Sequence, residues 1–530
     1  MSDPKKIKKR YDAMKNDRSV FESHYQEVAD LVLPRNANFT NEKAPGSKVM
    51  TKVFDSTAIH SNELLASTLV GINMNAATKW FAPNFGNMDD AAKKWTDNAA
   101  SVMLDAINAP SSKFYTSMFE YFVENCAFGT GGIFISEGNN SNGIHCQARS
   151  ISEMVIGAND RGDIDTVYRK FKWPVHTIYA KWGEDSGESV LKDYKEDKLE
   201  NKYEIIHAIQ PRAKVNKDRK DAKNLPIEEC YILVKDNHEL EEGGFHEMPL
   251  PVGRFYKSTM ETYGRSPAMT ALPFIKMLQE VMKITIKAAQ KSVDPAIIVP
   301  HDGFMGPLRT VPGGVNVFDA ASGRGVGDLV GQLPSAHPGT GLEFVQMLQD
   351  NIRTLFFIDQ LQFSGSPAMT ATEVLQRTEE KLRIIGPLQG RVQEFLGDVL
   401  KRIFGILLRQ GKFGEIPDSL PDNFEFEYNS AVSQAQKQQE ATGLVRGIQT
   451  LEPLVALNPS LLLDNLKENK ILRDTLSSFG VPQDQFEDEK VVDQTQELRK
   501  ENEQLQQQLL TLQEAGKAAQ GVQQAVGGQQ

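Results

Sequence analysis

The stretch Tyr263-Gly264-Arg265-Ser266-Pro267 opens a long helical pattern near the middle of the 530-residue chain. The pattern continues to about Val293, where Asp294-Pro295 ends it because a residue that precedes proline disfavours helical backbone. At ~1.5 Å per residue, a helix from Pro267 to Val293 is roughly 40 Å long. The sequence therefore predicts a helix well above the usual globular length, around which the rest of the chain is organised.

Two further helices are predicted after the first, each following a loop. A Pro/Gly-rich excursion over 295–341 leads to a helix over 342–358, where apolar residues recur at helical spacing. A short polar loop over 359–371 leads to a very long helix that ends near Gln410. Because proline lacks a backbone donor and clashes with the preceding turn, Gly386-Pro387 is expected to kink or break this last helix.

Residues 1–262 predict helices followed by an antiparallel sheet. Apolar residues at helical spacing cover 4–33 and 56–71, and two more helical patterns lie within 90–127. The period then changes to two in short runs rich in β-branched and aromatic residues, which is typical of strands. Asn159-Asp160-Arg161-Gly162-Asp163 is expected to be a hairpin turn.

The C-terminal part contains one predicted strand and several helices. Phe424-Glu425-Phe426-Glu427-Tyr428 alternates in polarity, which predicts a strand that returns to the same sheet. Helical pieces follow from Val432 to Ser478, and the Gln-rich segment 486–530 predicts a helix and a tail. A coiled-coil-like seam is indicated by apolar residues spaced every seven positions: Val491, Leu498, Leu505 and Leu512. The predicted class is α+β, mainly helical.

Composition restricts the classes of function. The net charge of −11 argues against a generic nucleic-acid coat protein, which is normally basic. Three cysteines without paired spacing indicate a reducing compartment. The charged N-terminus has no apolar segment after it, which predicts no signal peptide. No apolar run approaches the ~20 residues of a membrane helix, so we expect an intracellular chain without membrane contact.

No pattern indicates a catalytic or metal site. The histidines form no His-Glu-x-x-His pair, and the cysteines form no Cys-x-x-Cys pair. Gly323-Arg324-Gly325-Val326-Gly327 lacks the preceding strand and following helix of a dinucleotide-binding loop. Gly405–Lys412 comes close to a Walker A loop, but Phe413 stands where Ser or Thr is needed. We therefore expect neither enzymatic activity nor a cofactor.

Several strings, in order along the chain, resemble the head-to-tail connector, or portal, proteins of podoviruses. They are Phe54-Asp55-Ser56-Thr57, the Tyr263–Pro267 stretch, Pro312-Gly313-Gly314-Val315-Asn316 and Met369-Thr370-Ala371-Thr372-Glu373-Val374. The resemblance implies a ring, typically of twelve subunits, at one vertex of a phage capsid. Double-stranded DNA passes through such a ring during packaging and ejection.

The resemblance also implies a portal fold with named segments. They are the wing (1–262), stem helix 1 (263–294), clip (295–341), stem helix 2 (342–358), tunnel loop (359–371), a long kinked helix with a strand returning to the wing (372–434), helical crown (435–485) and C-terminal barrel helix and tail (486–530).

By the same resemblance, the clip docks the terminase large subunit and later the tail adaptor. The candidate clip contacts are Arg309, Asn316, Phe318 and Arg324. Short strands expected at Ile297-Ile298-Val299 and Val315–Phe318 favour a folded clip over a disordered insertion. Other implied partners are the major capsid protein, the scaffold and internal core proteins. The implied location is the portal vertex of the virion, after assembly in the host bacterial cytoplasm.

The tunnel loop of this family narrows the channel and retains DNA. Its candidate residues here are Gln362, Phe363, Ser364, Gly365, Ser366, Pro367 and Met369.

Four lysines of the first long helix lie within an arc of about 80° at 100° per residue. They are Lys276, Lys283, Lys287 and Lys291. An ordinary solvated helix face is one interpretation, whereas the resemblance implies a stripe that faces DNA. Roughly 40 Å of duplex carries about 24 charges, and twelve copies of four lysines present about 48, which would clamp the DNA. We predict that one or two lysines per subunit reach the lumen and that the others pair with acids such as Glu280 or a neighbour's Asp350.

Two other classes of function stay open on the sequence alone. One is an oligomeric capsid scaffold or interaction protein without a DNA channel, which would associate through its C-terminal helix. The other is an enzyme with an unrecognised site.

Overall fold

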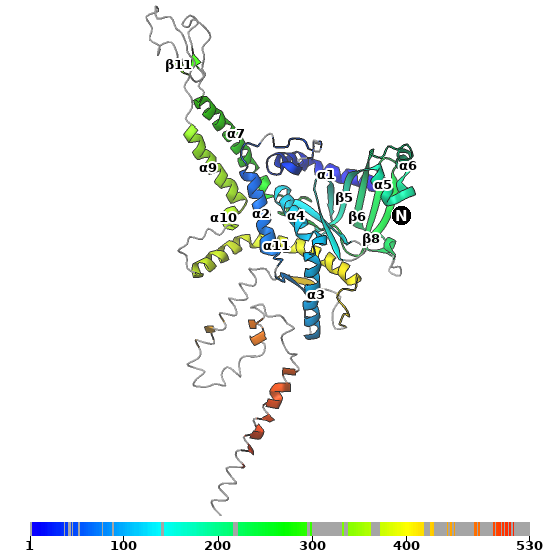
Figure 1. Cartoon of the computed structure of the whole chain (residues 1–530), viewed down its shortest axis with the longest axis vertical. Coiled ribbons are helices and arrows are strands. Elements are labelled where there is room, and N and C mark those ends of the chain that lie inside the picture. Colours follow the sequence, from blue (N-terminus) through cyan, green and yellow to red (C-terminus); the bar gives the residue numbers. More distant parts are fainter. Residues whose placement is uncertain are drawn as a thin grey trace, which may run out of the picture. The chain divides into compact units, whose positions relative to one another are not determined.

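The computed structural model describes residues 3–293 apart from short gaps (37, 41–43, 45, 51–52, 77, 87–89, 139–142 and 216–220), then 297–298, 331–332, 338–361, 371–417 and 424–428, and scattered residues between 443 and 512 (Figure 1). It mixes helices and strands, which confirms the α+β class. The chain divides into two compact units, Met1–Asn73 with Ala106–Gln410 and Met74–Asp105 with Gly411–Gln530. The segment 74–105, inside the predicted wing range, therefore belongs to the second unit.

The first unit contains two antiparallel sheets. The smaller has the strand order β3-β2-β9, formed by Ile144–Arg149, Thr130–Glu137 and Val252–Arg254. The larger has the order β4-β5-β6-β7-β8, formed by Met154–Ala158, Ile164–Pro174, Lys202–Pro211, Ile227–Leu233 and His238–Phe245. The predicted turn joins β4 to β5: the backbone N–H of Asn159 donates to the Asp163 carbonyl at 2.9 Å, and Gly162 has a φ of 82°.

Helices cover both faces of the larger sheet. Ile206 of β6 packs with α1 (Pro4–Leu31), whereas its neighbour Ile205 packs on the opposite face with α5 (Val175–Trp182) and α6 (Glu188–Lys195). This alternation follows from the two-residue period of a strand. Helices α5 and α6 were not predicted, because eight residues span only about two turns and give a weak periodic signal.

A buried cation attaches α1 to the larger sheet. Arg18 is 4% exposed, and its Nη1 donates to the carbonyls of Ile151 at 2.8 Å and Met154 at 2.6 Å. Its Nη2 donates to Glu22 at 2.8 Å. A charge this buried is stable only when it is paired and hydrogen-bonded, and these contacts meet both conditions. Helix α1 therefore cannot slide along the sheet without unpairing Arg18.

The predicted N-terminal helices are present. Helix α1 ends just before Leu33-Pro34, and α2 covers Thr57–Asn73, with its first N–H capped by the Asp55 carboxylate at 2.8 Å. The two patterns within 90–127 correspond to α3 (Asp90–Asn108) and α4 (Phe114–Phe128).

Helix α11 runs without interruption from Ala371 to Arg409, so of the two predicted outcomes at Gly386-Pro387 the break does not occur and the kink stays a prediction. One proline removes a single backbone hydrogen bond. The following half of the helix keeps the chain helical by burying an apolar face that includes Leu396, Leu400 and Ile403.

A carboxylate holds α11 against the sheet domain. Glu247 accepts from Arg402 Nη1 at 2.9 Å and from Arg409 Nη1 and Nη2 at 2.6 and 2.9 Å. Gly405 makes room for it, since a Cβ there would lie 2.2 Å from the Glu247 carboxylate. Burial alone would raise the pKa of Glu247, but the hydrogen bonds and charges of Arg409 and Arg402 outweigh it and hold the pKa below its usual range.

The second unit contains a two-stranded sheet. Strand β12 (Glu425–Tyr428) pairs antiparallel with β1 (Phe81–Asn84), with Phe81 opposite Tyr428. The prediction that this strand returns to the wing sheet is therefore wrong. Aromatic side chains account for the pairing: the Phe81 and Phe426 rings meet at 6.1 Å, and the Phe85 and Phe424 rings at 5.1 Å.

The residues described between 491 and 512 are helical. The predicted seam is exposed there: Val491 is 45% exposed, Leu498 59%, Leu505 54% and Leu512 72%. An apolar seam left open to solvent is typical of a helix that pairs with another helix.

Replacing Glu247 tests the attachment of α11. Glu247→Ala leaves the 4%-exposed Arg402 side chain as an uncompensated buried charge, so we expect the free energy of unfolding to fall by about 3 kcal/mol. Urea unfolding at neutral pH measures the change. Glu196→Ala, which removes an ion pair of the exposed Lys198, is the matched control and should change stability little. Equal effects of the two variants would contradict this role.

Candidate nucleic-acid interface

The two stem helices of the sequence analysis lie side by side as α7 (Pro267–Val293) and α9 (Pro338–Leu355) (Figure 1). The second ends earlier than predicted, because Phe357 adopts a φ of 59° and separates α9 from the short α10 (Ile358–Leu361). Beyond the hairpin, β10 (Ile297–Ile298) pairs antiparallel with β11 (Gly331–Gln332). The strand predicted at Ile297-Ile298-Val299 is confirmed for Ile297-Ile298, so the two ends of the excursion pair with each other. Val299 and the strand predicted over Val315–Phe318 lie outside the described residues.

The opening motif fixes where α7 starts. Gly264 crosses Gly129, the residue after α4, so closely that a Cβ on Gly264 would lie 2.1 Å from the Gly129 carbonyl oxygen. The Gly264 N–H donates to Thr130 Oγ1 at 2.9 Å. Ser266 caps the helix, since its Oγ accepts from the Met269 N–H at 3.0 Å and donates to the Ala127 carbonyl at 2.7 Å.

A polar junction holds α7, α9 and the start of α2 together. Gln279 is 5% exposed, and its Oε1 accepts from the backbone N–H of Phe54 at 2.6 Å and of Asp55 at 2.9 Å. Its Nε2 donates to the Asp55 carbonyl at 2.9 Å. Gln349 of α9 donates to the Asp55 carboxylate at 2.8 Å. The amide of Gln279 therefore satisfies three backbone groups that no regular helix bond reaches.

The buried contact between the stem helices is apolar and close. Buried apolar residues of the two helices include Ile275 and Leu278 of α7 and Val345, Leu348 and Ile352 of α9. Gly341 allows the close approach, because a Cβ there would lie 2.6 Å from Thr285 Oγ1.

Two of the four stem lysines are paired within the chain. Lys276 lies 2.7 Å from the Glu27 carboxylate of α1. Lys283 lies 3.5 Å from Glu280, one of the two acids named from the sequence. The other, Asp350, bonds instead to Arg353 of its own helix at 2.9 Å. The Lys276–Glu27 pair joins residues 249 positions apart, and no sequence pattern signals it.

The other two lysines lie nearer the C-terminal end of α7. Lys287 and Lys291 are exposed and form no ion pair with any residue that the structure describes. Lys291 is in the last turn, where the negative end of the helix dipole stabilises a cation. The charge available to an external anion is therefore concentrated at this end of the helix.

Helix α7 also has an exposed apolar strip, defined here as Phe274, Met277 and Ile284, which are 37%, 47% and 62% exposed. Phe274 and Ile286 belong by helical spacing to the apolar residues opposite the lysines, yet both side chains are exposed, Ile286 by 41%. At 100° per residue, the strip occupies an arc of about 80° between the lysines and the buried face. The helix thus has three faces, one buried, one basic and one apolar but uncovered.

The predicted tunnel-loop and clip residues lie outside the described residues. They are Gln362, Phe363, Ser364, Gly365, Ser366, Pro367 and Met369 of the tunnel loop, and Arg309, Asn316, Phe318 and Arg324 of the clip.

Other classes of site were sought in the described part of the chain. No three metal-ligating side chains gather there. No described helix is apolar over a length that could cross a bilayer. Cys126, Cys146 and Cys230 are buried free thiols, and burial raises the pKa of the Cys146 thiol to about 12.

Comparison with known protein families identifies the family of the chain. A family model described as bacteriophage head to tail connecting protein matches residues 4–486. The chain belongs to this family. Connector proteins are structural components of the virion and not enzymes.

Two connector relatives cover most of the chain. The portal protein of Salmonella phage epsilon15 is 26% identical over 475 residues, which is 87% of this chain and 85% of the relative. The probable portal protein of Bordetella phage BPP-1 is 25% identical over 466 residues, or 86% and 83% of the two chains.

Replacing Gly264 tests how the connector positions its stem. Gly264→Ala places a methyl group against the Gly129 backbone, which cannot move aside as a flexible side chain would, so we expect the free energy of unfolding to fall by about 1–3 kcal/mol. Gly71→Ala, in open space within α2, should instead stabilise by up to about 1 kcal/mol. Differential scanning calorimetry compares the variants. A neutral Gly264→Ala would contradict the crossing.

Proposed function

We propose that the chain forms a closed ring of twelve copies whose stem helices line a channel for double-stranded DNA during genome packaging and ejection. The observation that carries the proposal is the three-faced surface of α7. The buried face belongs to the subunit, and the uncovered apolar strip fits a second copy. The basic face stays available to DNA.

The apolar strip supports head-to-tail association. Phe274, Met277 and Ile284 project from one side of the stem hairpin, and large apolar patches open to solvent mark interaction surfaces. A contact between one side of a subunit and a different side of the next is heterologous. Such contacts close into a ring when the rotation that relates one subunit to the next divides a full turn evenly. The strip and the lysines occupy separate arcs of α7, so a neighbour that covers the strip leaves the lysine face open.

Charge balance supports a channel in which DNA slides. With Lys276 and Lys283 paired to Glu27 and Glu280, two lysines per subunit stay available. Twelve copies then present about 24 positive charges instead of the about 48 of the full stripe, which weakens the hold of the channel on the duplex. A twelvefold ring does not match the ~10.5-bp helical repeat, so its contacts are to the DNA backbone and independent of sequence.

The same proposal assigns roles to the clip, the tunnel loop and the wing. The clip (295–341), closed at its base by β10 and β11, docks the terminase large subunit and later the tail adaptor. The tunnel loop (359–371) narrows the channel. The wing contacts the major capsid protein, the scaffold and internal core proteins. Assembly takes place in the host bacterial cytoplasm, before the ring becomes part of the portal vertex of a short-tailed virion.

A second candidate is an oligomeric scaffold without a DNA channel. The exposed C-terminal seam favours it, because helices with such seams associate through them rather than through a stem. The two candidates differ in which surface holds the oligomer together.

Charge placed on the apolar strip should prevent ring formation. Met277→Glu with Ile284→Glu buries two carboxylates under the neighbouring subunit, which is strongly unfavourable. Mass photometry should then give the 59.0 kDa chain instead of a particle about twelve times heavier. Gln290→Glu, on the same helix but outside the strip, should assemble normally. Assembly that survives the double variant but fails after Leu498→Glu with Leu505→Glu would favour the scaffold.

The unpaired lysines should dominate the binding of DNA by the assembled ring. Lys287→Gln with Lys291→Gln removes contacts to phosphates, so the slope of log affinity against log salt should become shallower. Lys276→Gln with Lys283→Gln, which removes lysines already paired, should change that slope much less. Fluorescence anisotropy of a short labelled duplex over a range of salt concentrations measures both. Equal slopes for the two double variants would contradict the assignment of the lumen face.

A further inference from the structure

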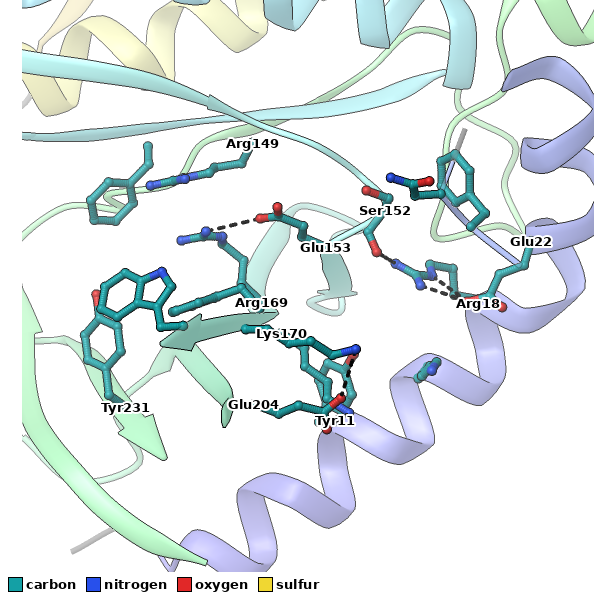
Figure 2. Close-up of a pocket in the computed structure, with 17 residues that line it drawn as sticks. Tyr11, Arg18, Glu22, Arg149, Ser152, Glu153, Arg169, Lys170, Glu204 and Tyr231 are labelled. Atoms are coloured by element: carbon teal, nitrogen blue, oxygen red, sulfur yellow. Dashed lines mark hydrogen bonds and ion pairs between the residues drawn. The ribbon is translucent and has the colours of Figure 1, made fainter. Parts of the chain in front are cut away.

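A pocket of about 660 Å³ lies between α1 and the two sheets (Figure 2). None of the four stem lysines lines it, and the proposed channel does not use it. Its wall comes from α1 and residues 38–39, from β2 and β3 of the smaller sheet, and from β5, β6 and β7 of the larger one. The volume is in the range of pockets that hold small molecules.

Positive charge exceeds negative charge around this pocket. Six cationic side chains line it, against three carboxylates: Lys15, Arg18, Arg149, Arg169, Lys170 and Lys172, against Glu22, Glu153 and Glu204. Lys170 is paired with Glu204 at 2.7 Å, and Arg18 is occupied by Glu22 and backbone carbonyls. Arg149 forms no ion pair with a described residue and Arg169 has Glu153 beside it, so much of the excess charge lies around these two guanidinium groups and Lys15.

Aromatic rings fix the planes of these two guanidinium groups. Arg149 at the end of β3 has its Cζ 6.0 Å from the centre of the Phe134 ring, and Arg169 of β5 has its Cζ 5.0 Å from the centre of the Phe171 ring. Stacking on a ring leaves the hydrogen-bonding edge of a guanidinium group free. Figure 2 shows both arginines on the wall of the pocket beside Glu153.

Both arginines keep hydrogen-bonding capacity that nothing in the described structure uses. Arg169 is only 7% exposed, and its one ion pair is with Glu153 at 3.2 Å. Arg149 donates to Gln147 through Nη2. The Nε atoms of both arginines are buried and have no hydrogen-bond partner among the described residues. Burial and the charge of Arg169 lower the pKa of Arg149 to about 10, as expected for two cations with too few anions.

We propose that this pocket binds a phosphate group, held between the guanidinium edges of Arg149 and Arg169. Buried unpaired donors are rare and costly, and a bound oxyanion would give the two guanidinium groups that carry them a charged hydrogen-bond partner at the nitrogens that face the pocket. A phosphate group fits better than a carboxylate, because it carries about −1.5 to −2 charges at pH 7 and offers three oxygens to donors on different strands. Inorganic phosphate and a nucleoside monophosphate share this chemistry, and the pocket is large enough for either.

Calorimetric titration of the assembled full-length protein at pH 7 tests the site, with inorganic phosphate in one arm and adenosine monophosphate in the other. We expect saturable binding of one ligand per chain. Equal affinities in the two arms assign the site to phosphate alone, and at least tenfold tighter binding of adenosine monophosphate assigns it to a nucleotide. Absence of saturable binding in both arms at concentrations of about 10 mM would overturn the proposal.

Variants locate the binding. Arg149→Gln and Arg169→Gln should each weaken binding at least tenfold, and Arg149→Lys, which keeps the charge but loses the planar fork, should have a smaller effect. Lys192→Gln, an exposed cation on α6, should bind like the wild type. Because Arg149→Lys retains a cation in the pocket, it reports on the site even if a neutral variant fails to fold. Wild-type affinity in all three arginine variants would place the ligand elsewhere and overturn the proposal.

Discussion

The crossing of Gly264 over Gly129 is the contact on which the stem depends. Two backbone segments approach within a distance that excludes any side chain at Gly264, and the chain then turns directly into α7 through the Ser266 cap. The start of the helix is thereby fixed against the end of α4 and the start of β2, in the interior of the sheet domain. A larger residue at position 264 would force the two backbone segments apart. The contact therefore sets the direction of the 27-residue helix α7 at its first turn.

The polar junction around Gln279 extends this constraint to the second stem helix. One amide satisfies backbone groups at Phe54 and Asp55, and the Asp55 carboxylate accepts from Gln349 of α9. Apolar packing alone would tolerate some rotation of the helices about their axes, whereas directional hydrogen bonds do not. The rotation of α7 decides which of its faces is buried and therefore where the lysines and the apolar strip point. The charge pattern of the stem thus follows from contacts made in the sheet domain.

Local signals allowed much of this fold to be predicted, and distant contacts account for the errors. The start of α7, the turn at 159–163 and the strand at Ile297-Ile298 each follow from neighbouring residues. Strand β12 has the expected alternation, but its partner was decided by aromatic contacts with β1, over 340 positions away. The pairing of Lys276 with Glu27 could not be predicted from the sequence, because the two residues are 249 positions apart. Phe274 fits the helical period of a buried residue, yet its exposure reveals a surface that the single chain leaves uncovered.

The central claim is that one face of α7 meets a neighbouring subunit while the adjacent face meets the channel. Single-particle electron cryomicroscopy of the purified assembly measures this directly, because side-chain density assigns both faces. The account predicts a closed ring in which Lys287 and Lys291 border the central opening and Phe274, Met277 and Ile284 lie under the next subunit. A ring with those lysines on its outer wall, or a particle joined only through its C-terminal helices, would contradict it.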